Sequence, residues 1–547
     1  MSFAFCFTAV SVLSSLSISM GSCLLWSGGP TVMVWGWFVV SIFTVIVGCS
    51  MGEVCSTYPS AGSVYHWTGQ LAPEKWAPLT AYICGWFNFM GNVAGDAAFA
   101  YGFANFVNSA RQIEKCPVDI DALYADALLN GIIDTTTSTS SSTGMAVECE
   151  TYSVGAQVGI AMGVATCWAA MNVSRVDAQG WMNNLAMAWQ VTTTIAIVVV
   201  LLVAAGRNED FQSDHFTWEI WRNRTGLSDD HFGYVILIGL LSSLFSFSGY
   251  EAGAHMAEET RNASLSSALG LLATTVVTAL VGLLYILGCI YSIPKRLGVF
   301  MALTAYGSPL PSLFCVVCGN RVGLILTNVV TTTLFFAGMS SLTVTSRIGF
   351  ALARDGAFPG SAFLRRVNPW TKSPIPMVML VLFIDWLLLL LPLATMKLDS
   401  EYGAIAFNAV TSICVIGYQI SYCIPLMLRG TVAARTFVRS SFSLGRAGTF
   451  VANVAWIWLF ITSLFLFWPT SFPVNQFNMN YTVVVVFGFF FIALLWWTLG
   501  GARHFFKGPL RVDANVFKQI ALAHAAAEAA AKAGEPQEAP AAEAAAN

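Results

Sequence analysis

Apolar residues along this chain form long runs that short polar segments separate. Runs such as 31–49 and 269–290 approach or match the roughly 20 residues that a helix needs to cross the hydrocarbon core of a bilayer. The expected spans cover residues 3–25, 31–55, 79–108, 153–171, 185–206, 233–257, 266–290, 323–351, 375–396, 402–428, 449–468 and 481–500. The pattern predicts an all-α integral membrane protein with twelve transmembrane helices.

Composition supports this interpretation and excludes several functions. Hydrophobic residues make up 56% of the chain and charged residues 10%, whereas about 25% of a soluble domain is charged. The formal net charge of −3 leaves no basic surface for a nucleic acid. No stretch in a suitable context has the pattern of a nucleotide-binding loop, a zinc hydrolase or a serine hydrolase. We therefore expect neither an enzyme nor a primary pump, and no metal or organic cofactor.

The first apolar run has no basic segment before it, so we expect it to be a span and not a cleaved signal peptide. The chain then begins almost inside the membrane. Residues 1–508 are expected to form one transmembrane domain. The tail at 509–547 is rich in Ala and Glu and lacks the large apolar side chains that a folded core needs, so we expect disorder there.

Basic residues are distributed unequally between the two sides of the membrane. With the N-terminus inside, 17 of the 26 Lys and Arg residues fall on the inner side. Because inner loops are enriched in these residues, both termini are expected to be cytosolic. The plasma membrane is the expected location, with an internal membrane as the alternative.

This orientation makes 109–152 and 207–232 outer loops. The second contains the sequon Asn223-Arg224-Thr225, so Asn223 is a candidate glycosylation site. The first contains Cys116 and Cys149, which can pair in an oxidising compartment. Two unpaired thiols are an equally good interpretation.

Three predicted spans carry a carboxyl group deep inside: Asp96, Glu251 and Asp385. Such a group is costly in lipid and usually faces the bundle interior or a water path. Glu251 lies between Gly249 and Gly253, which weaken a helix. A break there would expose backbone groups that can hold a substrate or a cation. The alternative is a helix contact at the glycines with a hydrogen-bonded glutamate. Asp96 either lines the same cavity or is packed and protonated, and Asp385 has no assigned role.

The first span is the expected partner of the sixth, because inverted-repeat transporters place one broken helix in each half. It carries serines that can satisfy backbone groups freed by a break, or that simply pack against neighbouring helices. These serines are Ser11, Ser14, Ser15, Ser17 and Ser19.

Several stretches resemble the amino acid–polyamine–organocation family. One runs from Gly28-Gly29-Pro30 to the segment MGEVCSTYPSAGSVY at 51–65, and another is ARDG at 353–356 with the two prolines at 374 and 376. GYEA at 249–252, followed by HMAEETRNA at 255–263, resembles the amino acid/choline subfamily, which includes fungal GABA and choline permeases. The chain departs from the family pattern in lacking a cytosolic N-terminal segment and in having Gly62-Ser63 in place of paired glycines.

The resemblance implies a LeuT-type fold, with spans 1–5 and 6–10 as inverted repeats and two further helices. It implies a substrate site at the breaks in spans one and six, formed by Ser14, Ser15, Leu16, Ser248, Gly249, Tyr250, Glu251 and Ala252. In span eight, Ser340 and Ser341 resemble the hydroxyls that bind sodium in sodium-coupled relatives. Glu53 and the pair Arg354-Asp355, at cytosolic span ends, are interpreted as gate or structural ion pairs.

Together these features predict a secondary active transporter of amino acids or related small amines that works by alternating access. A proton is the expected coupling ion, because a carboxyl such as Glu251 in a low-dielectric site can titrate near neutrality. Sodium at Ser340 and Ser341 is the alternative. The rival functions are a choline or polyamine transporter and a nutrient sensor that binds without transport. The sequence makes no prediction of oligomeric state.

Overall fold

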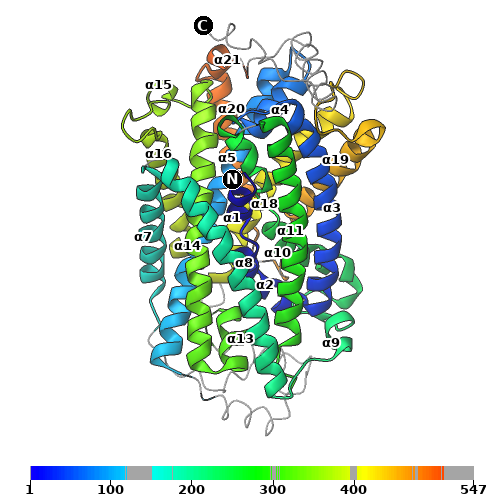
Figure 1. Cartoon of the computed structure of the whole chain (residues 1–547), viewed down its shortest axis with the longest axis vertical. Helices are drawn as coiled ribbons and strands as arrows, with labels where there is room; N and C mark the ends of the chain where they lie inside the picture. The colour runs from blue at the N-terminus through cyan, green and yellow to red at the C-terminus, as the bar shows by residue number, and fades with distance from the viewer. Residues whose placement is uncertain are drawn as a thin grey trace, which may run out of the picture.

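The computed structural model describes residues 2–117, 119, 151–174, 176–260, 262–295, 297, 303, 304, 306, 308–394, 403–470, 472–474, 479–506, 508 and 509. These residues form an elongated bundle in which most helices follow the long axis (Figure 1). In this part of the chain, ten helices are long and apolar enough to cross a membrane. The predicted fold class, an all-α integral membrane protein, is confirmed.

The helices coincide with the predicted spans. The first span is divided into α1 (Ser2–Val10) and α2 (Val12–Leu25), and the sixth into α10 (Phe232–Ser246) and the 3-10 helix η2 (Tyr250–Glu259). The other spans are α3 (Gly29–Thr57), α5 (Ala77–Lys115), α7 (Val154–Asn172), α8 (Val176–Arg207), α11 (Ala263–Tyr291), α14 (Asn320–Arg354), α16 (Ile375–Leu389), α18 (Gly403–Gly430), α19 (Gly448–Phe465) and α20 (Thr482–Thr498). The shorter elements are β1 (Ser27–Gly28), α4 (Ser63–Leu71), α9 (Asp214–Trp218), β2 (Arg222–Asn223), η1 (Asp229–His231), α13 (Pro309–Cys318), α15 (Ser361–Leu364), α17 (Leu391–Ala394), η4 (Gly445–Ala447) and α21 (Ala502–Phe505).

The third predicted span, α5, is not among the ten apolar helices, because polar and small residues are frequent along it. It nevertheless packs against α4, α7, α14, α16 and α18, and most of it is buried. Its buried polar side chains include Asn88, Asn92 and Asp96. A helix of this composition can lie within the membrane-spanning bundle because other helices, and not lipid, surround its polar side chains.

The outer surface of the bundle carries exposed apolar side chains. On α8, Ile195, Val199 and Val203 are each about half exposed and recur every four residues, so they share one face of the helix. Phe487 and Phe491 have the same spacing and exposure on α20. Lipid tails can cover such faces, as a membrane-spanning bundle requires.

Two glycines bring α5 and α18 into close contact. A Cβ atom added at Gly417 would lie 2.5 Å from the Cα atom of Gly91, so no side chain fits at the crossing. The contact places polar residues of the two helices within reach of each other. The Tyr418 hydroxyl of α18 donates a hydrogen bond to Asn92 Oδ1 of α5 at 2.7 Å.

A short antiparallel pairing of β1 with β2 joins the end of the first span to the second predicted outer loop. Ser27 is opposite Asn223, and Gly28 is opposite Arg222. The Arg224 N–H also donates to the carbonyl of Trp26 at 3.0 Å. The end of the first span is therefore anchored on that loop.

Candidate functional site

The first span is interrupted at Ser11, which has the left-handed backbone conformation with φ of +43°. This conformation is unfavourable for a residue with a side chain. The sequence placed the break at Ser14, Ser15 and Leu16. That position is wrong by at least three residues, because all three lie inside α2.

Hydroxyl groups surround this break, as the serine-rich sequence indicated. The Ser11 hydroxyl donates to Ser14 Oγ at 2.8 Å, and the Ser15 hydroxyl donates to the Ser11 carbonyl at 3.0 Å. Gln190 of α8 donates to Ser11 Oγ at 3.2 Å. Contacts within α2 and from α8 therefore hold the strained residue in place.

The sixth span is broken where the sequence predicted. α10 ends at Ser246, and Gly249 has φ of +84°, a conformation that glycine adopts without strain. The chain then continues as η2 and not as the expected α-helical segment. The Gly249 N–H donates to the Tyr422 hydroxyl of α18 at 3.3 Å, and the Ala252 N–H donates to the Gly249 carbonyl at 3.1 Å.

Glu251 follows this break and is fully buried. Asn88 of α5 donates to its Oε1 at 3.0 Å, and the Tyr422 hydroxyl donates to its Oε2. Asn88 also donates to Ser421 Oγ of α18 at 3.3 Å. In the described part of the chain, both donors to this carboxylate are neutral groups. A buried carboxylate held only by neutral donors keeps an unbalanced charge, which proton uptake can remove.

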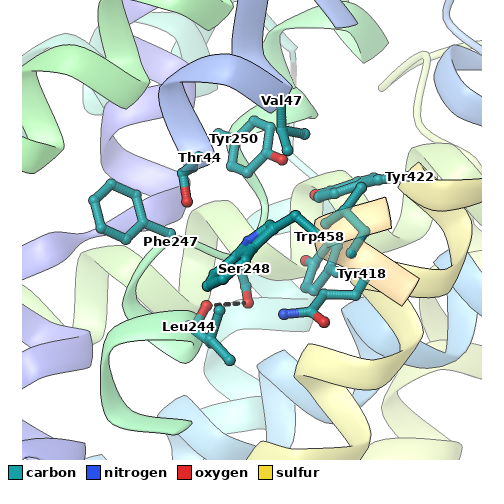
Figure 2. Close-up of a pocket in the computed structure, with 11 residues that line it drawn as sticks. Thr44, Val47, Leu244, Phe247, Ser248, Tyr250, Tyr418, Tyr422 and Trp458 are labelled. Carbon is teal, nitrogen blue, oxygen red and sulfur yellow. Dashed lines mark hydrogen bonds between the residues drawn. The ribbon is translucent and has the colours of Figure 1, made fainter. Parts of the chain in front are cut away.

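A small cavity adjoins the break. Figure 2 shows the side chains around it, which come from four helices and from the break itself. Its lining residues are Thr44, Val47, Leu244, Phe247, Ser248, Tyr250, Tyr418, Gln419, Tyr422, Trp458 and Leu459.

Of the predicted site residues, Ser248 and Tyr250 line this cavity, and Gly249, Glu251 and Ala252 are adjacent in the chain. Ser14, Ser15 and Leu16 do not line it. The aromatic residues that face the break from α18 and α19 were not among those predicted from the sequence. The spacing of Tyr418 and Tyr422, four residues apart in a predicted span, was the available signal because it places both on one helix face.

The tyrosines form a connected group. The rings of Tyr250 and Tyr422 are 5.1 Å apart between centroids, and those of Tyr418 and Tyr422 are 5.7 Å apart. Both distances are typical of favourable aromatic pairs. The hydroxyls of Tyr418 and Tyr422 are used by Asn92 and Glu251, respectively. The aromatic wall of the cavity is thus tied to the buried carboxyl.

The two candidate sodium ligands point to different helices. The Ser340 hydroxyl donates to Asn183 Oδ1 of α8 at 2.6 Å, whereas Ser341 lies beside Asp96 of α5. Successive residues of an α-helix are rotated by about 100°, which explains the divergence. The backbone carbonyl of Asn183 accepts a bond from Thr8 of α1 at 3.2 Å, near the first break.

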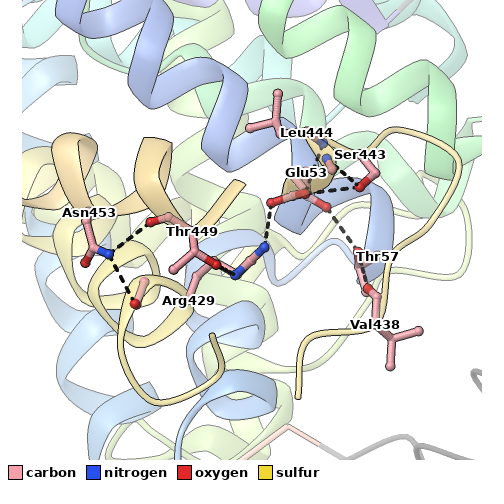
Figure 3. A network of polar contacts seen from close by, with 10 residues as sticks. Glu53, Thr57, Arg429, Val438, Ser443, Leu444, Thr449 and Asn453 are labelled. Carbon is pink, nitrogen blue, oxygen red and sulfur yellow. Dashed lines mark hydrogen bonds and ion pairs between the residues drawn. The ribbon is translucent and has the colours of Figure 1, made fainter. Parts of the chain in front are cut away.

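Glu53 forms a buried ion pair, one of the interpretations that the sequence suggested. Its Oε2 lies 3.1 Å from Nη2 of Arg429 at the end of α18 (Figure 3). Its Oε1 accepts bonds from the Leu444 N–H at 3.0 Å and from the Ser443 hydroxyl at 3.3 Å. The guanidinium of Arg429 lies over the Phe437 ring at 4.0 Å. Glu53 thus fixes the connection between α18 and α19.

Arg354 and Asp355 also pair, with 3.7 Å between Nε and Oδ1. The Tyr65 hydroxyl of α4 donates to Asp355 Oδ2 at 3.1 Å. Burial lowers the pKa of the neighbouring His66 to about 4, and the charge of Arg354 contributes to the shift. His66 is therefore neutral near pH 7 and adds no charge to this cluster.

The remaining predicted sites lie in the two segments that the sequence predicts to be outer loops. The amide nitrogen of Asn223 donates to the Leu227 carbonyl at 2.9 Å, and glycosylation there stays a prediction. Cys116 is disulfide-bonded, and Cys149 lies outside the described residues. Within the described ranges, no group of three or more His, Cys, Asp or Glu side chains could hold a metal ion.

Comparisons with known proteins agree with this architecture. Residues 2–490 match the family described as amino acid permease. The amino-acid permease BAT1 of Arabidopsis thaliana is 32% identical over 517 residues, covering 93% of this chain and 92% of that protein. Its homolog in Oryza sativa subsp. japonica is 31% identical over 518 residues, covering 93% and 91%. Amino-acid permease 2 of Neurospora crassa is 25% identical over 491 residues, covering 89% and 81%. The chain belongs to the amino acid permease family and is a multi-pass membrane transporter, not an enzyme.

Proposed function

We propose that the chain is a proton-coupled secondary active transporter that binds amino acids at the break between α10 and η2. The observation that carries this proposal is Glu251, a fully buried carboxyl with two neutral donors beside a cavity at a broken helix. Protonation of Glu251 removes a buried charge, so its state can be linked to the conformation of the break.

The chemistry of the break suits an α-amino acid. The first N–H groups of η2 form the positive end of a helix, which attracts a carboxylate. Tyr250, Tyr422 and Trp458 offer aromatic faces for an ammonium group. Choline or a polyamine would use only the aromatic faces and the acid. The relatives named as amino-acid permeases support the amino acid, and the amino acid/choline subfamily stays a prediction.

The hydroxyl geometry supports a proton over sodium. Ser340 is already bonded to Asn183, and Ser341 faces another helix. Two hydroxyls that diverge in this way are poorly placed to share one ion. We further propose that the chain lies in the plasma membrane with both termini in the cytosol, and that residues 1–508 form one transmembrane domain. The tail beyond residue 509 lies outside the described residues.

The proposal is tested by uptake into proteoliposomes that contain the purified full-length chain. Labelled amino acids, choline and a polyamine are each offered with an imposed proton gradient or an imposed sodium gradient. We expect an amino acid to accumulate with an acidic outside, and accumulation to stop when a protonophore is added. Binding without accumulation would indicate a sensor, and choline uptake alone would contradict the amino acid assignment.

The proposed orientation predicts the accessibility of two exposed positions, Ser228 in the second outer loop and Arg366 after α15. In intact cells, a membrane-impermeant maleimide should label Ser228→Cys above the wild-type background and leave Arg366→Cys at that background. In permeabilised cells both variants should be labelled. The reverse pattern in intact cells would place the termini outside.

A further inference from the structure

Two further carboxyl groups, those of Asp96 on α5 and Asp385 on α16, are buried in the bundle, each 1% exposed. Among the residues that the structure describes, no group makes a hydrogen bond of normal geometry to any of their four carboxyl oxygens, although Ser341 and Thr345 lie close to Asp96. The helices that carry them pack against each other and against α14. The two groups lie within reach of each other's charge, since Asp96 acts electrostatically on Asp385. Two ionised carboxylates in this position would repel each other in a medium that screens them poorly.

Burial opposes ionisation of Asp96, and one of the two neighbouring hydroxyls can accept a hydrogen bond from a protonated carboxyl. Ser341 and Thr345 of α14 lie beside Asp96. The Thr345 hydroxyl already donates its proton to the carbonyl of Ser341 at 3.0 Å, so its oxygen is left as an acceptor. A protonated Asp96 can donate to this oxygen, whereas an ionised Asp96 receives nothing from it. Sodium would need several more oxygen ligands, and the regular helices here offer few free carbonyls.

No cation in the described part of the surrounding helices compensates the pair. On α18, Cys414 and Tyr418 lie within electrostatic reach of Asp96 and of Glu251, and neither side chain carries a positive charge. On α7, Cys167 is exposed, and α15 and α17 carry no titratable residue. Three of the basic residues of α14 and α18 have other contacts: Arg347 lies over the Phe5 ring, Arg354 pairs with Asp355, and Arg429 pairs with Glu53. The fourth, Arg321, lies in the first turn of α14, far along the helix from Ser341 and Thr345.

A small cavity lies near the pair, although neither aspartate lines it. It is lined by Ala97, next to Asp96, and by Leu388 and Leu389, which lie about one turn beyond Asp385 on α16. It is separate from the cavity at the helix break, which none of these residues lines. The pair therefore has its own surroundings, distinct from those of Glu251.

We propose that Asp96 and Asp385 form a second proton-binding site, which holds at least one proton and exchanges it with water during the transport cycle. One O–H bond forms when the proton enters and breaks when it leaves, so no other reactant is needed. This inference extends the proposed proton coupling but does not require Glu251 to be the coupling group.

The first test uses dicyclohexylcarbodiimide, which modifies protonated carboxyls in apolar surroundings. The purified wild-type chain is treated over a range of pH and the adducts are located by peptide mass spectrometry. We expect adducts on Asp96 or Asp385 that decrease as the pH rises. They should persist in Glu251→Gln, which separates this site from the proposed function at Glu251. Absence of an adduct on both aspartates at every pH would overturn the proposal.

The second test measures protons carried per amino acid, with a pH-sensitive dye trapped in proteoliposomes. Asp385→Asn keeps the size of the side chain and removes its titration. We expect this variant to exchange substrate down its gradient but to carry one proton fewer per amino acid. Asp96→Asn should have the same effect, so the test survives if one variant does not fold. An unchanged proton ratio and an unchanged pH profile in a folded variant would show that the pair is only structural.

Discussion

Glu251→Gln is expected to reduce proton-driven uptake to the level of protein-free liposomes while exchange of substrate across the membrane survives. Glutamine reproduces the volume and hydrogen-bond pattern of a protonated glutamate. Its Oε1 can accept from Asn88 as Glu251 does, and its amide can donate to the Tyr422 oxygen once that hydroxyl rotates. The variant should therefore fold but stay permanently in the proton-loaded state.

Uptake against a gradient and counterflow of labelled amino acid, measured in the same vesicles, separate these two activities. Surface expression and the elution profile in detergent serve as controls for folding. Tyr422→Phe is a companion variant, because it removes one donor and leaves the carboxyl able to titrate. It should retain proton-driven uptake with a changed pH dependence. Full concentrative uptake by Glu251→Gln would mean that Glu251 is structural.

The largest expected effect on stability follows from removing Glu53. The Glu53 side chain is fully buried, and only 4% of the Arg429 side chain is exposed. Glu53→Ala leaves the guanidinium buried without its carboxylate, which costs about 3–5 kcal/mol in comparable pairs. It also removes the acceptor for the Leu444 N–H. A large decrease in the thermal unfolding temperature in detergent is the expected result.

Arg354→Ala is the matched control. Arg354 pairs with Asp355 as Arg429 pairs with Glu53, but 46% of the Arg354 side chain is exposed. Exposed ion pairs contribute only about 0–1 kcal/mol to the free energy of unfolding. A double variant in which both Glu53 and Arg429 are replaced by apolar residues should recover part of the lost stability, because no buried charge remains unpaired. Equal unfolding temperatures for Glu53→Ala and the wild type would contradict the interpretation of this pair.

The sequence was most informative where one residue type determines local structure. Apolar runs of bilayer length identified the spans. The second break was found because Gly249 accepts a positive φ without strain. The first break lies at Ser11, where the local sequence carries no such signal and contacts such as that from Gln190 hold the conformation. A local pattern cannot reveal a conformation that distant residues impose.

The partners of the buried acids were unpredictable for the same reason. Asn88 and Tyr422 are separated from Glu251 by 163 and 171 residues, so only the packing of α5, α18 and the sixth span brings them together. Arg429 lies 376 residues from Glu53. The position of each charged or polar residue within a span shows that burying it without a partner would be unfavourable. Which residue becomes its partner depends on how the helices are arranged.

The contact between Gly91 and Gly417 has a consequence for how Glu251 can lose its donors. Because the two backbones touch there, α5 and α18 are in direct contact about one turn from Asn88 and about one and a half turns from Tyr422. The bond from Asn88 to Ser421 adds a second link across the same interface. A displacement of the broken sixth helix that leaves this interface intact therefore moves Glu251 away from both donors together. The carboxyl then has two states, one with both hydrogen bonds and one with neither.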